Sequence, residues 1–272
     1  MIKEGSMTTI HHSGPYGYIL NEDGNAEIRQ YSGTDRVLTV PAYLDGHLVA
    51  TLGQGAFRDC TALVEIELPE GLVDVPSGCF QGCTALHHIR LSTGVTRIGS
   101  LAFAACQGLR DIEMPAGLTR IGFGAFRGCT GLRQVEFPER MRKLEDEAFN
   151  SCTGLTRADL PESLLSMGSR TFEDCWELRS VTLPSGLRSI GGSTFRDCTA
   201  LTEITLPAGL TCIRRKAFAG CTALGELTLP AGLSTIGRGA FSSCPGFTAL
   251  VPPGSPAQRA CSDQGIPFIC TD

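Results

Sequence analysis

Apolar residues recur along this chain with a fixed period of 23 residues. Each unit carries Leu-x-x-Ile-x-Leu-Pro, then Leu-x-x-Ile, then Ala-Phe-x-x-Cys. The Phe position returns nine times without insertion or deletion, from Phe57 to Phe241, and a Cys stands three residues after each Phe. A fixed period of this length indicates a solenoid, in which each unit buries its apolar face only against its neighbours.

Each unit is predicted to contain three legs. Leu-x-x-Ile-x-Leu ends in an apolar–polar alternation, which predicts a short strand with one face inward. Pro ends the strand because it has no N–H to donate, and Pro-x-Gly, as at residues 115–117, predicts a turn. The Leu-x-x-Ile leg is expected to be extended. The three- and four-residue spacing of Ala-Phe-x-x-Cys-x-x-Leu predicts one helical turn that packs Phe and Cys into the core.

The repeat pattern fades at both ends, where caps are expected. Residues 16–31 form two alternating segments around Asp23-Gly24, which predicts a β-hairpin. At the other end Ser255, Pro256 and Gln258 have the order of N-cap, N1 and N3 of a helix, and residues 266–269 read as a last strand. We expect residues 1–14 to be disordered or derived from an expression vector, 15–56 to form the N-terminal cap and a longer first coil, 57–250 the repeat array, and 251–272 the C-terminal cap.

The chain has 13 cysteines, and nine of them occupy one repeat position. In a solenoid this position stacks copy on copy, at about 4.8 Å. A linear row cannot supply the converging ligands that zinc needs, so we predict a column of buried thiols that act as small hydrophobic groups, and no metal site. Cys261 and Cys270 lie close together in the C-terminal cap, where a disulfide remains open.

Charge and motifs exclude several functions. The net charge of −5 and the pI of about 5.6 disfavour nucleic acid and anionic membranes as partners. No apolar run reaches the roughly 20 residues that cross a bilayer. Residues 122–128 lack the spacing of a phosphate loop, and His87 and His88 adjoin only Cys83 of the buried column. We therefore predict no catalytic residues and no cofactor.

The whole repeat, Leu-x-x-Ile-x-Leu-Pro-x-x-Leu-x-x-Ile-x-x-x-Ala-Phe-x-x-Cys, resembles the BspA-like, or treponemal-type, leucine-rich repeat proteins. The likeness runs from about Tyr16 to Ile269 and departs at few positions, such as Ala158 for Ile and Thr171 for Ala. It implies an α/β repeat solenoid, a right-handed coil with a parallel β-sheet on its concave face. It also implies a surface or secreted, adhesin-like protein of host-associated bacteria, which binds host matrix or bacterial surface proteins and shares no catalytic residues.

Two columns of residues flank the inward Ile of each predicted strand and vary while the framework repeats. In the N-terminal half they are mostly charged, and beyond Ser180 the second column becomes Thr. A charged patch steers partners and sets specificity. The predicted ligand-binding residues of the concave face are Glu65, Glu67, His88, Arg90, Asp111, Glu113, Gln134, Glu136, Arg157 and Asp159. Drift of solvent-facing positions is the alternative explanation of this variation.

Two aromatic residues, Phe123 and Trp176, interrupt the repeat at outward positions. Such residues are favoured binding hot spots, although single exposed apolar residues are common. The hypothesis that follows is a monomeric, non-enzymatic recognition module at the cell surface or secreted, with a protein ligand. An intracellular scaffold is the alternative, favoured by the thiol column and by the absence of a leader in this sequence. An enzyme would need an activity that depends on His87 and His88.

Overall fold

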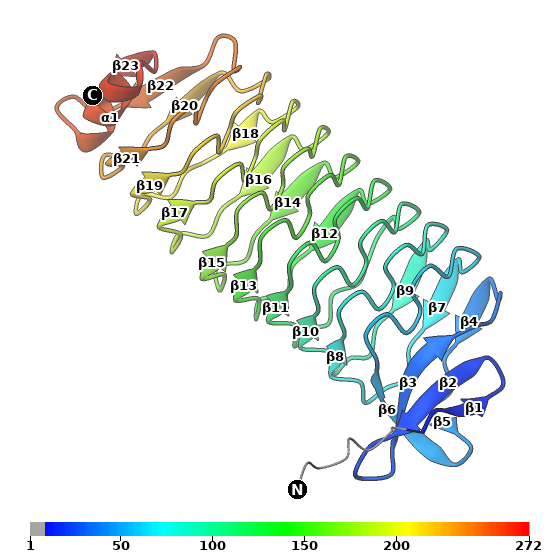
Figure 1. Ribbon diagram of the computed structural model, residues 1–272. Helices are drawn as coiled ribbons and strands as arrows, with labels where there is room; N and C mark the ends of the chain where they lie inside the picture. Colours follow the sequence, from blue (N-terminus) through cyan, green and yellow to red (C-terminus); the bar gives the residue numbers. More distant parts are fainter. Residues whose placement is uncertain (1–8, 272) are drawn as a thin grey trace, which may run out of the picture.

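The computed structural model describes residues 9–271, and these form an elongated solenoid (Figure 1). The chain winds from an N-terminal cap, drawn in blue, to a C-terminal cap, drawn in red, at the opposite end. Two rows of short strands follow the long axis, and turns join them in every coil. The predicted repeat solenoid with parallel sheets is confirmed. Among the described residues it contains a single α-helix, α1 (Pro256–Gln264), so the array itself consists of strands and turns.

A five-stranded sheet covers the N-terminal end, in the order β1 (His11–Ser13), β2 (Tyr16–Leu20), β3 (Ala26–Tyr31), β6 (His47–Leu52) and β5 (Tyr43–Leu44). Strands β2 and β3 are the predicted hairpin, and β3 pairs in parallel with β6. We expected residues 1–14 to be disordered, but His11–Ser13 pair with β2. The Ser13 and Tyr18 hydroxyls both donate to the Asp45 carboxylate, at 2.8 and 2.9 Å, which ties this segment to the cap. Residues 1–8 of the same prediction lie outside the described residues.

The first row of strands comes from the Leu-x-x-Ile-x-Leu legs and pairs in parallel. It comprises β4 (Val37–Thr39), β7 (Glu65–Glu67), β9 (His88–Arg90), β12 (Gln134–Glu136), β14 (Arg157–Asp159), β16 (Ser180–Thr182), β18 (Glu203–Ile204), β20 (Glu226–Thr228), β22 (Thr248–Val251) and β23 (Phe268–Cys270). Within the three-residue strands of the array, such as β9 and β12, the central residue is inward and the two flanking residues point outward, as the alternation predicts. We call this outward side the variable sheet face.

The second row comes from the Leu-x-x-Ile legs and is also parallel. It comprises β8 (Asp74–Val75), β10 (Arg97–Ile98), β11 (Arg120–Ile121), β13 (Lys143–Leu144), β15 (Ser166–Met167), β17 (Ser189–Ile190), β19 (Cys212–Ile213) and β21 (Thr235–Ile236). These strands are only two residues long because the following residue bends the chain into the turn leg. They form one edge of the solenoid in Figure 1, opposite the first row.

The leg that carries Phe and Cys is a run of tight turns, and the predicted helical turn is wrong. The residues two before and two after each Phe have positive φ, for example 57° at Arg170 and 61° at Asp174 around Phe172. Because of this alternation, neighbouring N–H groups of the turn leg donate alternately to a carbonyl of their own coil and to a carbonyl of the next coil. Arg58 N donates to Gly55 O at 2.9 Å, and Phe57 N donates to Cys79 O at 2.9 Å. The spacing correctly placed Phe and Cys inside, but left-handed residues end any helix.

The nine repeated Phe rings form one stack through the core. Consecutive ring centroids lie 5.1–5.8 Å apart, with interplanar angles of 20° or less. Tyr31 lies against Phe57 at 5.4 Å, and Phe247 lies against Phe241 at 4.2 Å, so each cap extends the stack by one ring. Each aromatic pair contributes about 0.5–1.5 kcal/mol beyond the area it buries.

The predicted column of thiols is buried at seven of its nine positions and half-buried at its two ends, Cys60 and Cys244, and its thiols are free. From Cys83 onward each Sγ donates to the carbonyl of the Phe in the preceding coil, at 3.0 Å from Cys83 to Phe57 and at 3.1 Å from Cys129 to Phe103. Burial raises the pKa of Cys152 to about 12. The buried thiols are therefore protonated, hydrogen-bonded parts of the core. Cys261 and Cys270 are also free.

The C-terminal cap follows its predicted capping pattern. Helix α1 begins after Ser255, whose side chain accepts from Gln258 N at 3.2 Å, with Pro256 in the first turn. It ends at Gly265, whose φ of 63° is left-handed and suits glycine. Strand β23 then pairs in parallel with β22 and closes the first row.

Candidate functional site

The structure places the ten predicted ligand-binding residues on the variable sheet face, where nine are exposed and Glu67 is half-buried. The strand registers bring them together as neighbours: Glu65 lies beside His88, and Gln134 lies beside Arg157. The central residues between them, such as Ile89 and Ala158, are fully buried. The scaffold therefore holds outward side chains at fixed spacing while their chemical type changes from coil to coil.

The variable sheet face is not continuous. Asp111 and Glu113 are exposed like their neighbours, but residues 111–113 form no strand and separate the β4–β7–β9 sheet from the β12–β14–β16–β18 sheet. The hydrogen bond from Arg110 N to His87 O is long, 3.4 Å, where the preceding coil has 2.8 Å from His87 N to Val64 O. This break could not be predicted, because the apolar pattern of that coil is regular.

Ion pairs neutralise only part of the charge on this face. Arg90 Nη1 lies 2.7 Å from Glu67 Oε1, and His88 Nδ1 lies 3.5 Å from Asp111 Oδ1. Both pairs are solvent-exposed, so each contributes about 0–1 kcal/mol. Among the ten predicted residues, the carboxylates of Glu65, Glu113 and Glu136 have no ion pair within residues 9–271.

Arg157 and Asp159 form the third ion pair of the face. Partial burial acts to raise the pKa of Asp159, but hydrogen bonds from Arg157 and from Thr182 outweigh it, so the pKa is lowered. The carboxylate is therefore charged at neutral pH. Two partners therefore hold the Asp159 carboxylate in place, whereas the carboxylates of Glu113 and Glu136 have no ion pair among residues 9–271.

A hollow of about 170 Å³ opens at the N-terminal end of the variable sheet face. Its lining includes Val37 and Thr39 of β4 together with Glu65, His88 and Arg90 from the next two strands. Val37 is 66% exposed, an unusual value for a Val on a strand. The hollow combines an apolar wall with charged rims, a composition that suits recognition of a protein side chain.

The two predicted hot-spot residues lie away from the variable sheet face. Phe123 is 39% exposed and follows β11, where it borders a hollow together with Lys143 and Glu145. Trp176 is 55% exposed and follows Cys175 in the turn leg. The structure therefore does not join them to the ten predicted ligand-binding residues. Leu165, 71% exposed beside β15, is a further outward apolar residue that the pattern search missed, because its coil fits the repeat.

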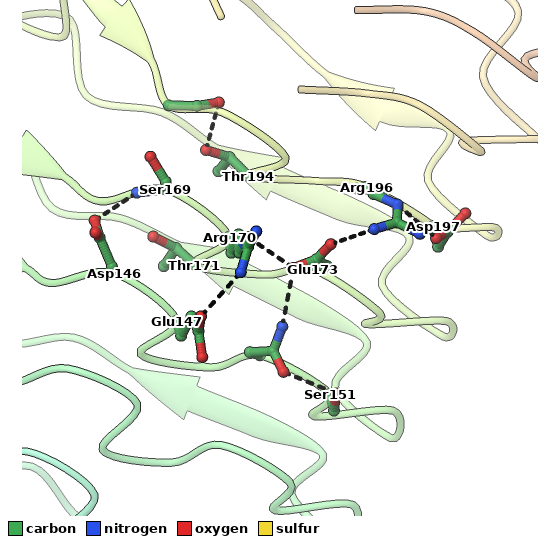
Figure 2. Close-up of polar contacts among 12 residues, drawn as sticks. Asp146, Glu147, Ser151, Ser169, Arg170, Thr171, Glu173, Thr194, Arg196 and Asp197 are labelled. Carbon is green, nitrogen blue, oxygen red and sulfur yellow. Dashed lines mark hydrogen bonds and ion pairs between the residues drawn. The ribbon is translucent and has the colours of Figure 1, made fainter. Parts of the chain in front are cut away.

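A second polar cluster, also missed, lies on the turn leg around Glu173 (Figure 2). The Glu173 carboxylate is buried and accepts hydrogen bonds from Arg196 at 2.9 Å and from Asn150 at 3.3 Å, and it lies 3.6 Å from Arg170. Burial raises the pKa of Glu173 in spite of the two arginines. The cluster could have been found in the sequence from the residue that follows the repeated Phe, because in three consecutive coils this residue is polar: Asn150, Glu173 and Arg196. The geometry cross-links three coils.

The described residues give no support to metal or thiol chemistry. No group of three or more His, Cys, Asp or Glu side chains converges to hold a metal ion within residues 9–271. Cys83 is buried, and its thiol donates to Phe57 O, while a hydrogen bond with Cys60 and burial both raise its pKa. The Cys83 thiol is therefore protonated at neutral pH. Over the same residues, no helix has the length and apolar character needed to span a bilayer.

These observations define a class: a repeat solenoid with an internal framework of Phe, Cys, Leu and Ile and an outward strand face of varying chemistry. The sequence profile of the BspA type leucine rich repeat region, with six copies, matches residues 46–156 and 119–248. The chain belongs to this family, and the resemblance seen in the sequence is confirmed.

Solved structures agree with this assignment. The chain is similar to the Treponema pallidum leucine rich repeat protein TpLRR, with 29% identity over 79% of this chain and 91% of that one and a TM-score of 0.58. It is also similar to the pneumococcal vaccine antigen PcpA, with 21% identity over 90% and 82% of the two chains and a TM-score of 0.56. A leucine rich cell surface protein from Faecalibacterium prausnitzii shares 24% identity over 92% and 96%, with a TM-score of 0.48. No curated protein matches the sequence.

Proposed function

We propose that this chain is a non-enzymatic recognition module that binds a protein ligand on the N-terminal half of its variable sheet face. The observation that carries the proposal is the contrast between a framework repeated nine times and the outward residues of the same strands, which vary along the N-terminal half of the array. A repeat solenoid offers an extended surface of this kind for partners. Family membership supports an interaction role, since leucine-rich repeats generally mediate contacts between proteins.

The partner's surface should be basic. The ten residues of the proposed site carry six carboxylates and two arginines, which gives −6 + 2 = −4 with His88 neutral. The free carboxylates of Glu65, Glu113 and Glu136 are available to Lys or Arg of a partner. Complementary charge raises the association rate and excludes wrong partners more than it raises affinity. The hollow beside Val37 would take an apolar side chain of the same ligand.

A place at the cell surface or outside the cell, with an adhesin-like role toward host matrix or bacterial surface proteins, is the cellular setting that we propose. It rests on family membership. An intracellular scaffold is the second candidate, favoured by the 13 free thiols, because exported proteins usually oxidise their cysteines. Fractionation of the source cells, with an antibody against this chain, separates the two settings.

The test of the site is a charge-reversal set in which Glu67, Glu113, Glu136 and Asp159 become Lys. Binding is measured by biolayer interferometry against a panel of immobilised matrix and bacterial surface proteins, beginning with those that bind the unmodified chain. The matched control reverses Glu203 and Glu226, which lie on the same face in the C-terminal half. We expect the first set to weaken binding by at least about tenfold, which is about 1.4 kcal/mol, and the control to leave it unchanged. Equal binding by both variants would remove the site assignment.

A further inference from the structure

A groove of about 380 Å³ runs across successive coils where the second row of strands bends into the turn leg. It lies along β6, β8, β10 and β11 and is separate from the variable sheet face. Its lining includes Gln54, Ser77 and Ser100 from the bends and Arg97 and Arg120 from the strands. Glu145 of a further coil also lines it.

The coils along this groove share a backbone N–H position, two residues after the inward Ile or its equivalent. Its neighbours on both sides are bonded: Gly99 N donates to Val75 O at 2.7 Å, and Leu101 N donates to Phe123 O at 2.8 Å. Ser100 N between them has no acceptor in the described part of the chain, and neither do Ser77 N and Gln54 N. Three consecutive coils therefore line the groove with unpaired donors.

The next coil shows which chemical group binds such a donor. Glu145 stands where most other coils have glycine, and its Oε2 accepts from Phe123 N at 3.0 Å. Arg120 and Lys143 complete the surroundings of this carboxylate, the latter at 3.4 Å. Burial acts to raise the pKa of Glu145, but hydrogen bonds from these two cations outweigh it and lower the pKa. A carboxylate in this position is held in its charged form.

A second carboxylate binds an equivalent N–H farther along the array, but it comes from the preceding coil instead of the next one. Asp146 Oδ1 accepts from Ser169 N at 2.8 Å, and Figure 2 shows the two residues facing one another. Ser169 is the equivalent of Ser77 and Ser100, two residues after the inward Met167. Wherever this chain supplies a partner to these N–H groups, that partner is a carboxylate oxygen.

The groove has room for such a group. A Cβ on Gly99 would lie 2.6 Å from Ser77 N, and a Cβ on Gly122 would lie 2.7 Å from Ser100 N, so any side chain at these positions would crowd the donor, and glycine avoids this. The local charge is also favourable. Arg97 and Arg120 are paired with Asp74 and Glu145. Arg58 lines a neighbouring hollow that shares Gln54, Ser77 and Ser100 with the groove, and the only hydrogen-bond partner of its side chain among residues 9–271 is the neutral Gln81. The sum of these groups is +3 − 2 = +1, on a chain of net charge −5.

We infer that this groove is a second binding site, which takes the carboxylate side chains of an acidic polypeptide segment at the N–H groups of Ser77 and Ser100. The inference goes beyond the proposed function, because it concerns another face and a partner of opposite charge. The free hydroxyls of Ser77 and Ser100 add donors beside each amide. Hydrogen bonds to an ionised acceptor are roughly twice as strong as neutral ones, which gives the site its preference for carboxylate over amide.

The test uses ¹⁵N-labelled chain titrated with acetylated tetraglutamate amide and followed by amide chemical shifts. We expect saturable shifts at Ser77 and Ser100. Phe123 and Ser169 are internal controls, because their N–H groups already donate to Glu145 and Asp146. Their amide signals should not shift. Tetraglutamine, the neutral isostere, should bind at least about tenfold more weakly.

A variant extends the test within the same groove. Glu145→Gly installs the residue that Gly99, Gly122, Gly168, Gly191 and Gly237 provide in other coils. It should free Phe123 N and add its amide to those that respond to tetraglutamate. Uniform shifts, equal binding of tetraglutamine, or no response at Ser77 and Ser100 would overturn the inference. A response to oligogalacturonate but not to the peptide would overturn the assignment to a polypeptide partner.

Discussion

The Phe stack predicts a large and local stability effect at Phe126. This ring is fully buried, and the centroids of Phe103 and Phe149 both lie 5.1 Å from it. Substitution Phe126→Ala leaves a cavity in a core that relaxes only partly, which costs about 3–5 kcal/mol. Phe126→Leu keeps much of the apolar volume and removes two ring contacts, which costs about 1–3 kcal/mol. Since a domain is stable by about 5–15 kcal/mol, Phe126→Ala removes a large fraction of the total.

The chain provides a matched control three residues away. Phe123 is 39% exposed, so Phe123→Ala should change stability by no more than about 0.5 kcal/mol. Urea unfolding at 25 °C is followed by far-UV circular dichroism and by the fluorescence of Trp176, the only tryptophan. Coincident curves from the two probes justify a free energy of unfolding for each variant. If Phe126→Ala cost less than about 1 kcal/mol, or no more than Phe123→Ala, the stack would not be the core described above.

Three further measurements follow from other parts of the structure. A thiol reagent added to the native chain should modify the exposed Cys270 quickly and the half-buried Cys60, Cys212 and Cys244 more slowly. The other nine cysteines are buried and should react only after unfolding. Fast labelling of all 13 thiols would contradict their burial. Burial raises the pKa of Glu173, so the folded state loses stability as pH rises above about 4.5, and Glu173→Gln should gain stability over the unmodified chain across that range. Hydrogen bonds from Ser185 lower the pKa of Glu162, so Glu162→Gln should lose stability relative to the unmodified chain over the same pH range. Equal pH profiles of the two variants would refute this reasoning. Gly237→Ala should destabilise by about 1–3 kcal/mol, since the new Cβ would lie 2.3 Å from Arg215 N, whereas Gly186→Ala meets nothing within 4 Å and should be neutral or slightly stabilising in thermal unfolding.

The repeat allowed most of the fold to be predicted because every coil meets the same neighbours. The inward positions of Phe, Cys, Leu and Ile follow from periodicity alone, and so does the stacking of residues 23 apart. The capping helix was predictable because Ser255 and Gln258 carry a local hydrogen-bond signal. These features depend on side chains next to one another in sequence or at one period.

The turn leg and the first strand were not predictable, for two different reasons. A three-residue spacing of inward groups fits both a helix and a pair of tight turns, and only the backbone angles at residues such as Arg170 and Asp174 separate them. Strand β1 forms because Ser13 and Tyr18 meet Asp45, 32 and 27 residues away, and no local pattern reports that contact.

The candidate sites were also predictable only in part. The outward columns were visible in the sequence, and the structure places all ten residues on one face. The break at Asp111–Glu113 and the unpaired N–H groups of Ser77 and Ser100 were not visible, because they depend on how one coil settles against the next. A sequence search for positions where Glu145 replaces a repeated Gly would have drawn attention to the groove, though not to its donors.

The nine units without insertion or deletion have a consequence for how such a protein changes over generations. Since the framework contacts are made between equivalent positions in adjacent coils, a unit removed by unequal recombination brings together two surfaces that already match. Loss of residues 104–126 would seat Ala148 and Phe149 against Ala102 and Phe103, which now receive Ala125 and Phe126. The length of the array, and with it the number of side-chain rows available to a ligand, is thus a heritable quantity that can vary in whole steps without damage to the core.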